Sequence, residues 1–86
     1  MIHLTILNLK EKIFDGNVES ITLPGEAGEL TVLTNHVPIV TAMKQGAMNA
    51  LMSGEEPFDA ALGRRKYFES KGGIFEFNNN EATILL

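Results

Sequence analysis

Hydrophobic residues recur at every second position along most of this chain. Ile2, Leu4 and Ile6 alternate with His3 and Thr5 at the start. A period of two residues is typical of a β-strand that buries one face, whereas an amphipathic helix repeats every 3.6 residues. The pattern predicts strands over residues 2–7, 11–14, 18–23, 28–33, 37–43, 48–52, 64–69, 74–77 and 82–86. Residues 58–62 fit a strand or a helical turn, and periodicity does not decide between them.

Turn-forming residues separate most of these segments. Asp15-Gly16 predicts a hairpin turn, because glycine readily adopts the positive φ that tight turns need. Further turns are predicted at Pro24-Gly25, Thr34-Asn35, Gly72-Gly73 and the asparagines at 78–80. Short strands with turn signals every 8–12 residues, and no long amphipathic helix, predict an all-β sandwich or barrel.

The alternation is interrupted once, within residues 18–23. Val18 and Ile21 are both apolar, but their odd spacing directs them to opposite faces of a regular strand. A strand that keeps both side chains in the core needs a bulge or a strong twist. We therefore expect a backbone irregularity between these two residues.

Length and charge narrow the possible functions. The 86 residues are enough for a single domain, here residues 1–86, with one modest core. The net charge of −4 argues against a nucleic-acid partner, which requires clustered cations. Four cations do lie close together near Tyr67 and Phe68, and we interpret them as a solvated strand face: Arg64, Arg65, Lys66 and Lys71. No apolar segment approaches the ~20 residues that span a bilayer, so no direct membrane insertion is expected.

Residues suited to catalysis or metal binding are scarce. The chain has no cysteine, and its only histidines, His3 and His36, have no histidine or carboxylate partner at a metal-motif spacing. Ser20, Ser53 and Ser70 lack the sequence context of a nucleophile elbow. The Pro-Gly-x-x-Gly run from Pro24 is neither a Walker loop nor a dinucleotide fingerprint. We predict no catalytic, cofactor-binding or metal-binding residue.

Lys44 leaves a carrier function open. The run Ala42-Met43-Lys44 resembles the Ala-Met-Lys-Met motif of biotinyl carrier domains, where the modified lysine lies on a hairpin tip. The resemblance fails at Gln45, which stands where that motif has its second methionine, and Thr41 stands where carriers place an acidic residue. A carrier domain modified at Lys44 and a small ligand-binding β-sandwich are the two alternative interpretations.

A longer series of motifs resembles the epsilon subunit of F-type ATP synthase. In order along the chain, the matching runs are Ile13-Phe14-Asp15-Gly16, Val18-Glu19-Ser20-Ile21-Thr22-Leu23-Pro24-Gly25, Glu26-Ala27-Gly28-Glu29-Leu30, His36-Val37-Pro38, Thr41-Ala42-Met43-Lys44-Gln45-Gly46, Lys71-Gly72-Gly73-Ile74-Phe75-Glu76-Phe77 and Ala82-Thr83-Ile84-Leu85. The resemblance is weakest between residues 53 and 66. Together, in this order, the motifs are specific.

The resemblance implies a fold and a role. The fold is a flattened ten-stranded β-sandwich at the foot of a rotary stalk, between the gamma subunit and the polar loops of the membrane c-ring. The subunit itself is non-catalytic and couples proton transport to ATP synthesis. Such a protein is peripheral, at the cytoplasmic face of a prokaryotic cell membrane. The resemblance places Glu29, Thr31 and His36 toward the c-ring, and we expect Asn8 and Leu9 to face gamma.

The sequence departs from the family pattern in two places. Thr31 replaces a glycine, and Thr34-Asn35 replace a Pro-Gly pair before His36. Asparagine also tolerates the left-handed region, so we expect the loop shape to persist. The family also commonly continues into a C-terminal hairpin of two helices, whereas this chain ends at Leu86, and we expect a natural short form that lacks the hairpin.

Overall fold

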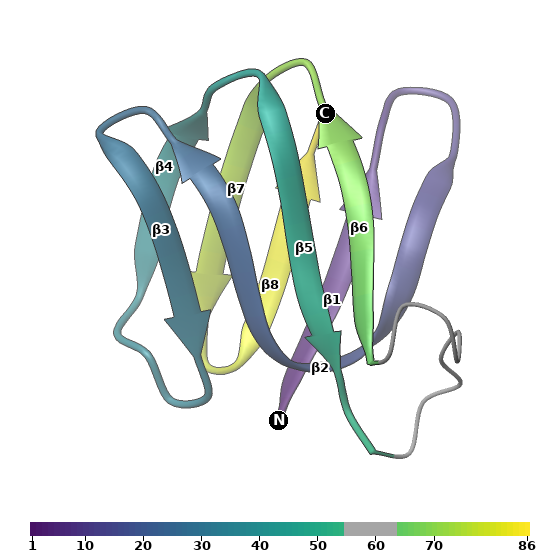
Figure 1. The fold of residues 1–86 in the computed structure, drawn as a ribbon, viewed down its shortest axis with the longest axis vertical. Helices are drawn as coiled ribbons and strands as arrows, with labels where there is room; N and C mark the ends of the chain where they lie inside the picture. Colours follow the sequence, from purple (N-terminus) through teal and green to yellow (C-terminus); the bar gives the residue numbers. More distant parts are fainter. Residues whose placement is uncertain (55–63) are drawn as a thin grey trace.

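The chain folds into two layers of β-strands that enclose an apolar core (Figure 1). The computed structural model describes residues 1–54 and 64–86. Its strands are β1 (Ile2–Leu7), β2 (Lys12–Gly25), β3 (Gly28–Leu33), β4 (Ile39–Met43), β5 (Gly46–Met52), β6 (Arg65–Ser70), β7 (Gly73–Asn78) and β8 (Glu81–Leu85). The all-β prediction is confirmed, and the described residues contain no helix.

Strand β2 belongs to both layers. Its first half pairs with β1, which continues through β8 and β7 to β4. Its second half lies between β3 and β5, and β6 pairs with β5 at the edge of that layer. Strands β1 and β8 pair in parallel, so the first and last strands of the chain lie side by side. Because one strand serves both layers, the sandwich is closed along that side.

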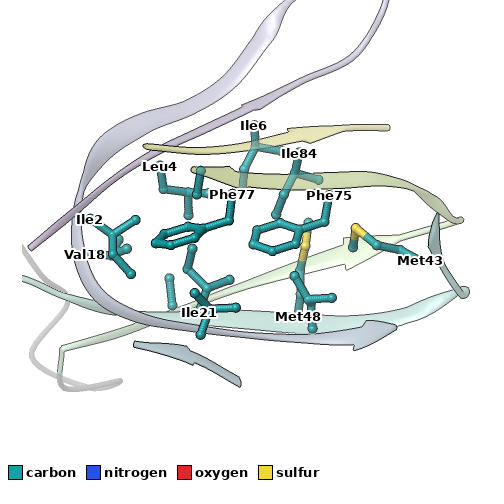
Figure 2. Close-up of a cluster of buried hydrophobic side chains, with 14 of the residues drawn as sticks. Ile2, Leu4, Ile6, Val18, Ile21, Met43, Met48, Phe75, Phe77 and Ile84 are labelled. Atoms are coloured by element: carbon teal, nitrogen blue, oxygen red, sulfur yellow. The ribbon is translucent and has the colours of Figure 1, made fainter. Parts of the chain in front are cut away.

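The core lies between the layers and follows the predicted alternation. Figure 2 shows Phe75 and Phe77 of β7 at its centre, facing Ile21 of β2 and Met48 of β5. Both phenylalanines are almost fully buried. The other fully buried large side chains come from the same inward positions: Ile2, Leu4, Ile6, Val18, Leu23, Val32 and Ile84. Burial of each such side chain contributes roughly 1.5–3 kcal/mol, so the alternating pattern is the main source of stability.

The number of strands differs from the ten predicted, because the described residues form eight. The hairpin predicted at Asp15-Gly16 was wrong: both residues lie within β2, opposite Thr5 and Leu4 of β1. Since the chain does not turn there, the strands predicted over residues 11–14 and 18–23 are both part of the single strand β2. The segment 58–62, counted as the tenth, lies outside the described residues.

The turn between β1 and β2 instead occurs at residues 8–11. The Asn8 side chain accepts hydrogen bonds from the backbone N–H groups of Lys10 and Glu11, each at 2.8 Å. The backbone N–H of Asn8 donates to the carbonyl of Glu11 at 3.0 Å. A short polar side chain that binds the backbone two or three residues ahead closes a turn without glycine. The sequence signal at Asp15-Gly16 was stronger, but this local capping decided where the chain reverses.

The irregularity expected between Val18 and Ile21 is confirmed. The register of β2 against β5 shifts between Val18 and Ser20, and Ser20 and Ile21 are both buried. The extra residue returns Ile21 to the core side after the strand has changed layers. The turn predicted at Thr34-Asn35 is confirmed as well, and the bend predicted at Gly72-Gly73 lies one residue earlier, at Lys71-Gly72, because Gly73 already belongs to β7.

Close backbone packing explains one of the glycines at the β6–β7 turn. A Cβ atom on Gly73 would lie 2.3 Å from the carbonyl oxygen of Leu85 in β8. No atom lies within 4 Å of the corresponding position on Gly28, although its φ of 135° is also unusual for other residues. The pairing of β7 with β8 therefore requires glycine, which has no side chain, at position 73.

A cluster of charged side chains joins β1 to both of its neighbours. The His3 ring places Nε2 at 2.5 Å from a carboxylate oxygen of Asp15 and Nδ1 at 3.0 Å from one of Glu81. Lys12 forms an ion pair with the second oxygen of Asp15 at 2.9 Å. Hydrogen bonds to Asp15 and then to Glu81 raise the pKa of His3 above its usual 6.5. Hydrogen bonds from Lys12 and then His3 lower the pKa of Asp15 below its usual 3.8.

We predict that Gly73→Ala destabilises the protein by about 1–3 kcal/mol more than Gly28→Ala does. Both substitutions place a side chain at a positive φ, but only the first drives a Cβ into the β8 backbone. Urea unfolding of the two variants measures the difference in the free energy of unfolding. Equal values would mean that the β7–β8 contact relaxes at no cost.

We predict that His3→Gln removes part of the pH dependence of the free energy of unfolding. A raised folded pKa means that the stabilisation by His3 is fully present below pH 6.5 and is lost as the pH rises through the folded value. The contribution of Asp15 is present above pH 3.8 and is lost as the pH falls through its own lower folded value. The difference in unfolding free energy between wild type and variant should thus be largest between these limits and decline above pH 6.5. Urea midpoints measured across the pH range test this, and a constant difference would contradict it.

Candidate functional site

The described part of the chain carries shallow surface hollows and no assembled chemical centre. Within residues 1–54 and 64–86, no group of three His, Cys, Asp or Glu side chains is arranged to hold a metal ion. One hollow of about 320 Å³ is lined by Pro38, Ile39, Val40, Glu76, Phe77 and Asn78. A second, of about 200 Å³, lies between β3 and β4. In the same ranges, no helix is long and apolar enough to cross a membrane.

His36 lies at the end of the sandwich formed by residues 34–38 and 78–80, called here the His36 end. The Thr34-Asn35 turn carries the chain away from β3, and Asn35 has a φ of 67°. The His36 ring packs edge-on against Phe77, with 6.1 Å between the ring centres. Its Nδ1 lies 2.7 Å from the carbonyl of Val37, and its backbone N–H donates to the carbonyl of Leu33. The loop thus holds His36 through both backbone and ring.

Glu29 and Thr31 lie on the outward face of β3, together with the exposed Leu33. The hydroxyl groups of Thr31 and Thr22 are 3.0 Å apart across the β3–β2 pair. Glu29 lines the hollow between β3 and β4. Because β3 runs from Gly28 to Leu33, Glu29 lies at its start and His36 lies beyond its far end. The three proposed c-ring residues therefore occupy one side of the sandwich rather than one compact patch.

Asn8 and Leu9 lie at the other end of the sandwich. The residues of this connection, 8–11, follow β1, whereas the turn at 78–80 of the His36 end precedes the parallel strand β8. Leu9 is 96% exposed, while the Asn8 side chain is occupied in closing the turn. Of the two residues proposed to face gamma, Leu9 is fully exposed, whereas Asn8 is half-buried and its Oδ1 is bound within the turn.

Sequence reasoning missed an exposed apolar row at the Leu9 end. Cross-strand pairing aligns Leu7, Leu85, Ile74 and Ala42 on the outer face of β1, β8, β7 and β4. Ile74 is 47% exposed and Leu85 is 44% exposed. Ile74 is next to buried Phe75 in the sequence, and Leu85 is next to buried Ile84. Adjacent residues of a strand point to opposite faces, so these apolar pairs were the sequence signal for an exposed apolar face. Only the pairing of distant strands makes these four residues neighbours.

Lys44 lies in a connection that crosses between the layers. It follows β4, which pairs with β7, and precedes β5, which pairs with β2 and β6. The backbone N–H of Lys44 donates to the carbonyl of Pro24 at 2.8 Å, and its side chain is exposed. The two strands beside it are not paired with each other, so Lys44 does not lie at the tip of a hairpin as a carrier lysine does.

The basic residues near β6 have partners within the fold. Arg64 donates to a carboxylate oxygen of Glu19 at 2.9 Å and to the carbonyl of Met52 at 2.7 Å. The Lys66 ammonium lies 5.6 Å from the centre of the Phe14 ring. These contacts connect β6 to β2 and β5, in agreement with a structural interpretation of the cluster.

Comparison with known proteins identifies relatives along the whole chain. The family described as "ATP synthase, Delta/Epsilon chain, beta-sandwich domain" matches residues 1–86. The ATP synthase epsilon chain of Polaromonas naphthalenivorans is 32% identical over 84 residues, which cover 98% of this chain and 55% of the relative. That of Delftia acidovorans is 33% identical with the same coverage. The chain thus spans about half the length of these relatives.

Solved structures share the fold. One chain in a structure of the Euglena gracilis mitochondrial ATP synthase, described as OSCP/F1/c-ring, superposes with a TM-score of 0.80 at 24% identity. The match covers 98% of this chain and 49% of that one. One chain in the central stalk/c-ring structure of the Tetrahymena thermophila enzyme superposes at 0.73 with 16% identity, covering 98% and 61%. At such identities the likeness shows the fold alone.

Two independent observations agree on the family. The strand order forms a closed two-layer sandwich, and the family match extends over every residue from 1 to 86. The relatives named above exceed 30% identity over nearly the whole chain. The chain therefore belongs to the delta/epsilon family of ATP synthase chains, as the β-sandwich domain of that family.

Proposed function

We propose that this chain is a rotor subunit of an F-type ATP synthase, linking the gamma subunit to the membrane c-ring. The observation that supports this most is the family match over residues 1–86, with relatives named ATP synthase epsilon chain. In this role the subunit is non-catalytic and transmits rotation driven by proton transport to the sites of ATP synthesis. We place it as a peripheral subunit at the cytoplasmic face of a prokaryotic cell membrane.

For the gamma contact, we propose the surface made of the apolar row and Leu9. The row and Leu9 lie at the same end of the sandwich, and Leu9, Ile74 and Leu85 all expose apolar side chains there. The centres of protein interfaces are apolar and poor in charge, which this row matches. Asn8 contributes by holding the turn that presents Leu9.

For the c-ring contact, we propose the outward face of β3 and the His36 end. Glu29, Thr31 and His36 are polar and accessible at least in part, which suits a partner surface made of polar loops. Rim charges at such interfaces set orientation and specificity more than affinity. This assignment leaves the charged cluster around His3, on the outer face of β1, outside both contacts.

The first expected result concerns complex formation. The tagged chain, expressed with the gamma subunit of the same organism, should co-purify with gamma in equal amounts. Leu9→Glu combined with Ile74→Glu should reduce the recovered gamma about tenfold, because two charges would be desolvated in an apolar contact. Tyr67→Glu, a similar change on the exposed face of β6, serves as the matched control. Failure of the wild-type chain to retain gamma in gentle conditions would refute the proposed function.

The second expected result concerns Glu29. Glu29→Lys should weaken docking on the c-ring about fivefold and lower the protons pumped per ATP hydrolysed in reconstituted vesicles. Its unfolding free energy should stay within about 0.5 kcal/mol of wild type, since the side chain is exposed. Glu69→Lys makes the same charge change on β6 and should leave coupling intact. Unfolding of the Glu29→Lys variant would instead identify a structural role.

A further inference from the structure

Two asparagines from distant turns bind each other at the His36 end. The backbone N–H of Asn35 donates to Oδ1 of Asn80 at 2.7 Å, and Nδ2 of Asn80 donates to Oδ1 of Asn35 at 2.9 Å. The residues are 45 positions apart, one in the turn after β3 and the other in the turn between β7 and β8. The Asn80 side chain therefore closes a two-point contact, called here the Asn pair.

Both members of the Asn pair adopt a restricted backbone conformation. Asn35 has a φ of 67° and Asn80 a φ of 60°, in the left-handed region that asparagine tolerates better than other side chains. The family's glycine at position 35 offers that conformation without a side chain. Asparagine at position 35 adds a side-chain amide, and the oxygen of that amide accepts a hydrogen bond from the amide of Asn80. The departure from the family motif is thus matched by a tertiary partner.

His36 directly follows Asn35 of the Asn pair. Nδ1 of His36 lies 2.7 Å from the Val37 carbonyl, which only accepts hydrogen bonds, so Nδ1 carries a proton. In the neutral ring this leaves Nε2 as a hydrogen-bond acceptor. Nε2 forms no hydrogen bond with any described residue, and the ring packs against that of Phe77 at an interplanar angle of 85°. The loop therefore presents one defined acceptor to a partner that supplies a donor.

We propose that Asn80 is a positioning residue for docking on the c-ring: through Asn35 it holds the loop that aims His36 Nε2 at a donor in the ring's polar loops. The proposal rests on the proposed function for its partner. The ordering of the loop does not depend on that function, since the Asn pair acts within the isolated chain. A loop that is ordered before binding loses less conformational freedom on docking, and the affinity rises accordingly.

Three variants separate positioning from general stability. Asn80→Gly removes the amide and keeps the left-handed backbone, which glycine accepts without strain. Asn79→Gly is the matched control, because Asn79 lies in the same turn with a φ of 51°. Its side chain forms no hydrogen bond with any described residue. Asn80→Asp restores an acceptor for the Asn35 N–H, and a flipped Asn35 amide donates to the second carboxylate oxygen.

The first measurement uses the full 86-residue chain in solution. In Asn80→Gly, hydrogen exchange of the Asn35 amide should quicken about tenfold, because its acceptor is gone. The NMR signals of the His36 ring protons should move toward those of a mobile histidine as the ring leaves Phe77. Both signatures should remain near wild type in Asn79→Gly and return in Asn80→Asp. Unchanged exchange and unchanged His36 signals in Asn80→Gly would overturn the proposal.

The second measurement is binding to the cognate c-ring in lipid nanodiscs, with the chain held in its complex with gamma. Asn80→Gly should bind about threefold to tenfold more weakly than Asn79→Gly, with Asn80→Asp restored. A loosened loop with unchanged binding would overturn the positioning role. Absence of ring binding by the wild-type complex would refute the proposed function and, with it, the docking role. The solution signatures distinguish this outcome, because the Asn pair would still be seen to order the loop.

Discussion

Strand β2 must keep its apolar side chains in the core while passing from one layer of the sandwich to the other. A regular strand turns successive side chains to opposite faces, so a strand that changes layers would otherwise expose half of its buried residues. The register shift between Val18 and Ser20 resolves this, since it restores Ile21 to the inside. Every other strand is placed by pairing, directly or through a neighbour, with one of the two halves of β2.

The two layers have outer faces of different character. The outer face of β1 and β8 carries the His3 cluster near the His36 end and the apolar row near the Leu9 end. On the other layer, Thr22, Thr31 and Asn49 are aligned across neighbouring strands, and the same outer face carries Glu29 on β3 and Glu69 on β6. The His3 cluster and the apolar row thus lie at opposite ends of one outer face. A small sandwich with no room for a deep cavity can still offer distinct surfaces to different partners.

Backbone conformation and side-chain contact act together at the turns. Gly73 is needed because the β8 backbone passes too close for a Cβ. Asn35 and Asn80 occupy left-handed positions where glycine would also fit, but each also gains a hydrogen bond from the other. The turns are therefore in contact with neighbours that lie far away in sequence, and the turn before His36 is bound by one of them, Asn80.

The sequence by itself determined the all-β class, the inward residues, the bulge in β2 and most turns, because alternation and turn propensity are local properties. It failed at Asp15-Gly16, where the turn propensity of two residues was outweighed by pairing with β1 and by the capping side chain of Asn8. It named Glu29, Thr31, His36, Asn8 and Leu9 as surface residues, but not their positions relative to one another. Only the tertiary structure placed His36 and Leu9 at opposite ends, aligned the apolar row and joined Asn35 to Asn80. These relations depend on which distant strands pair, and strand pairing is decided by burial of the whole core rather than by any local segment.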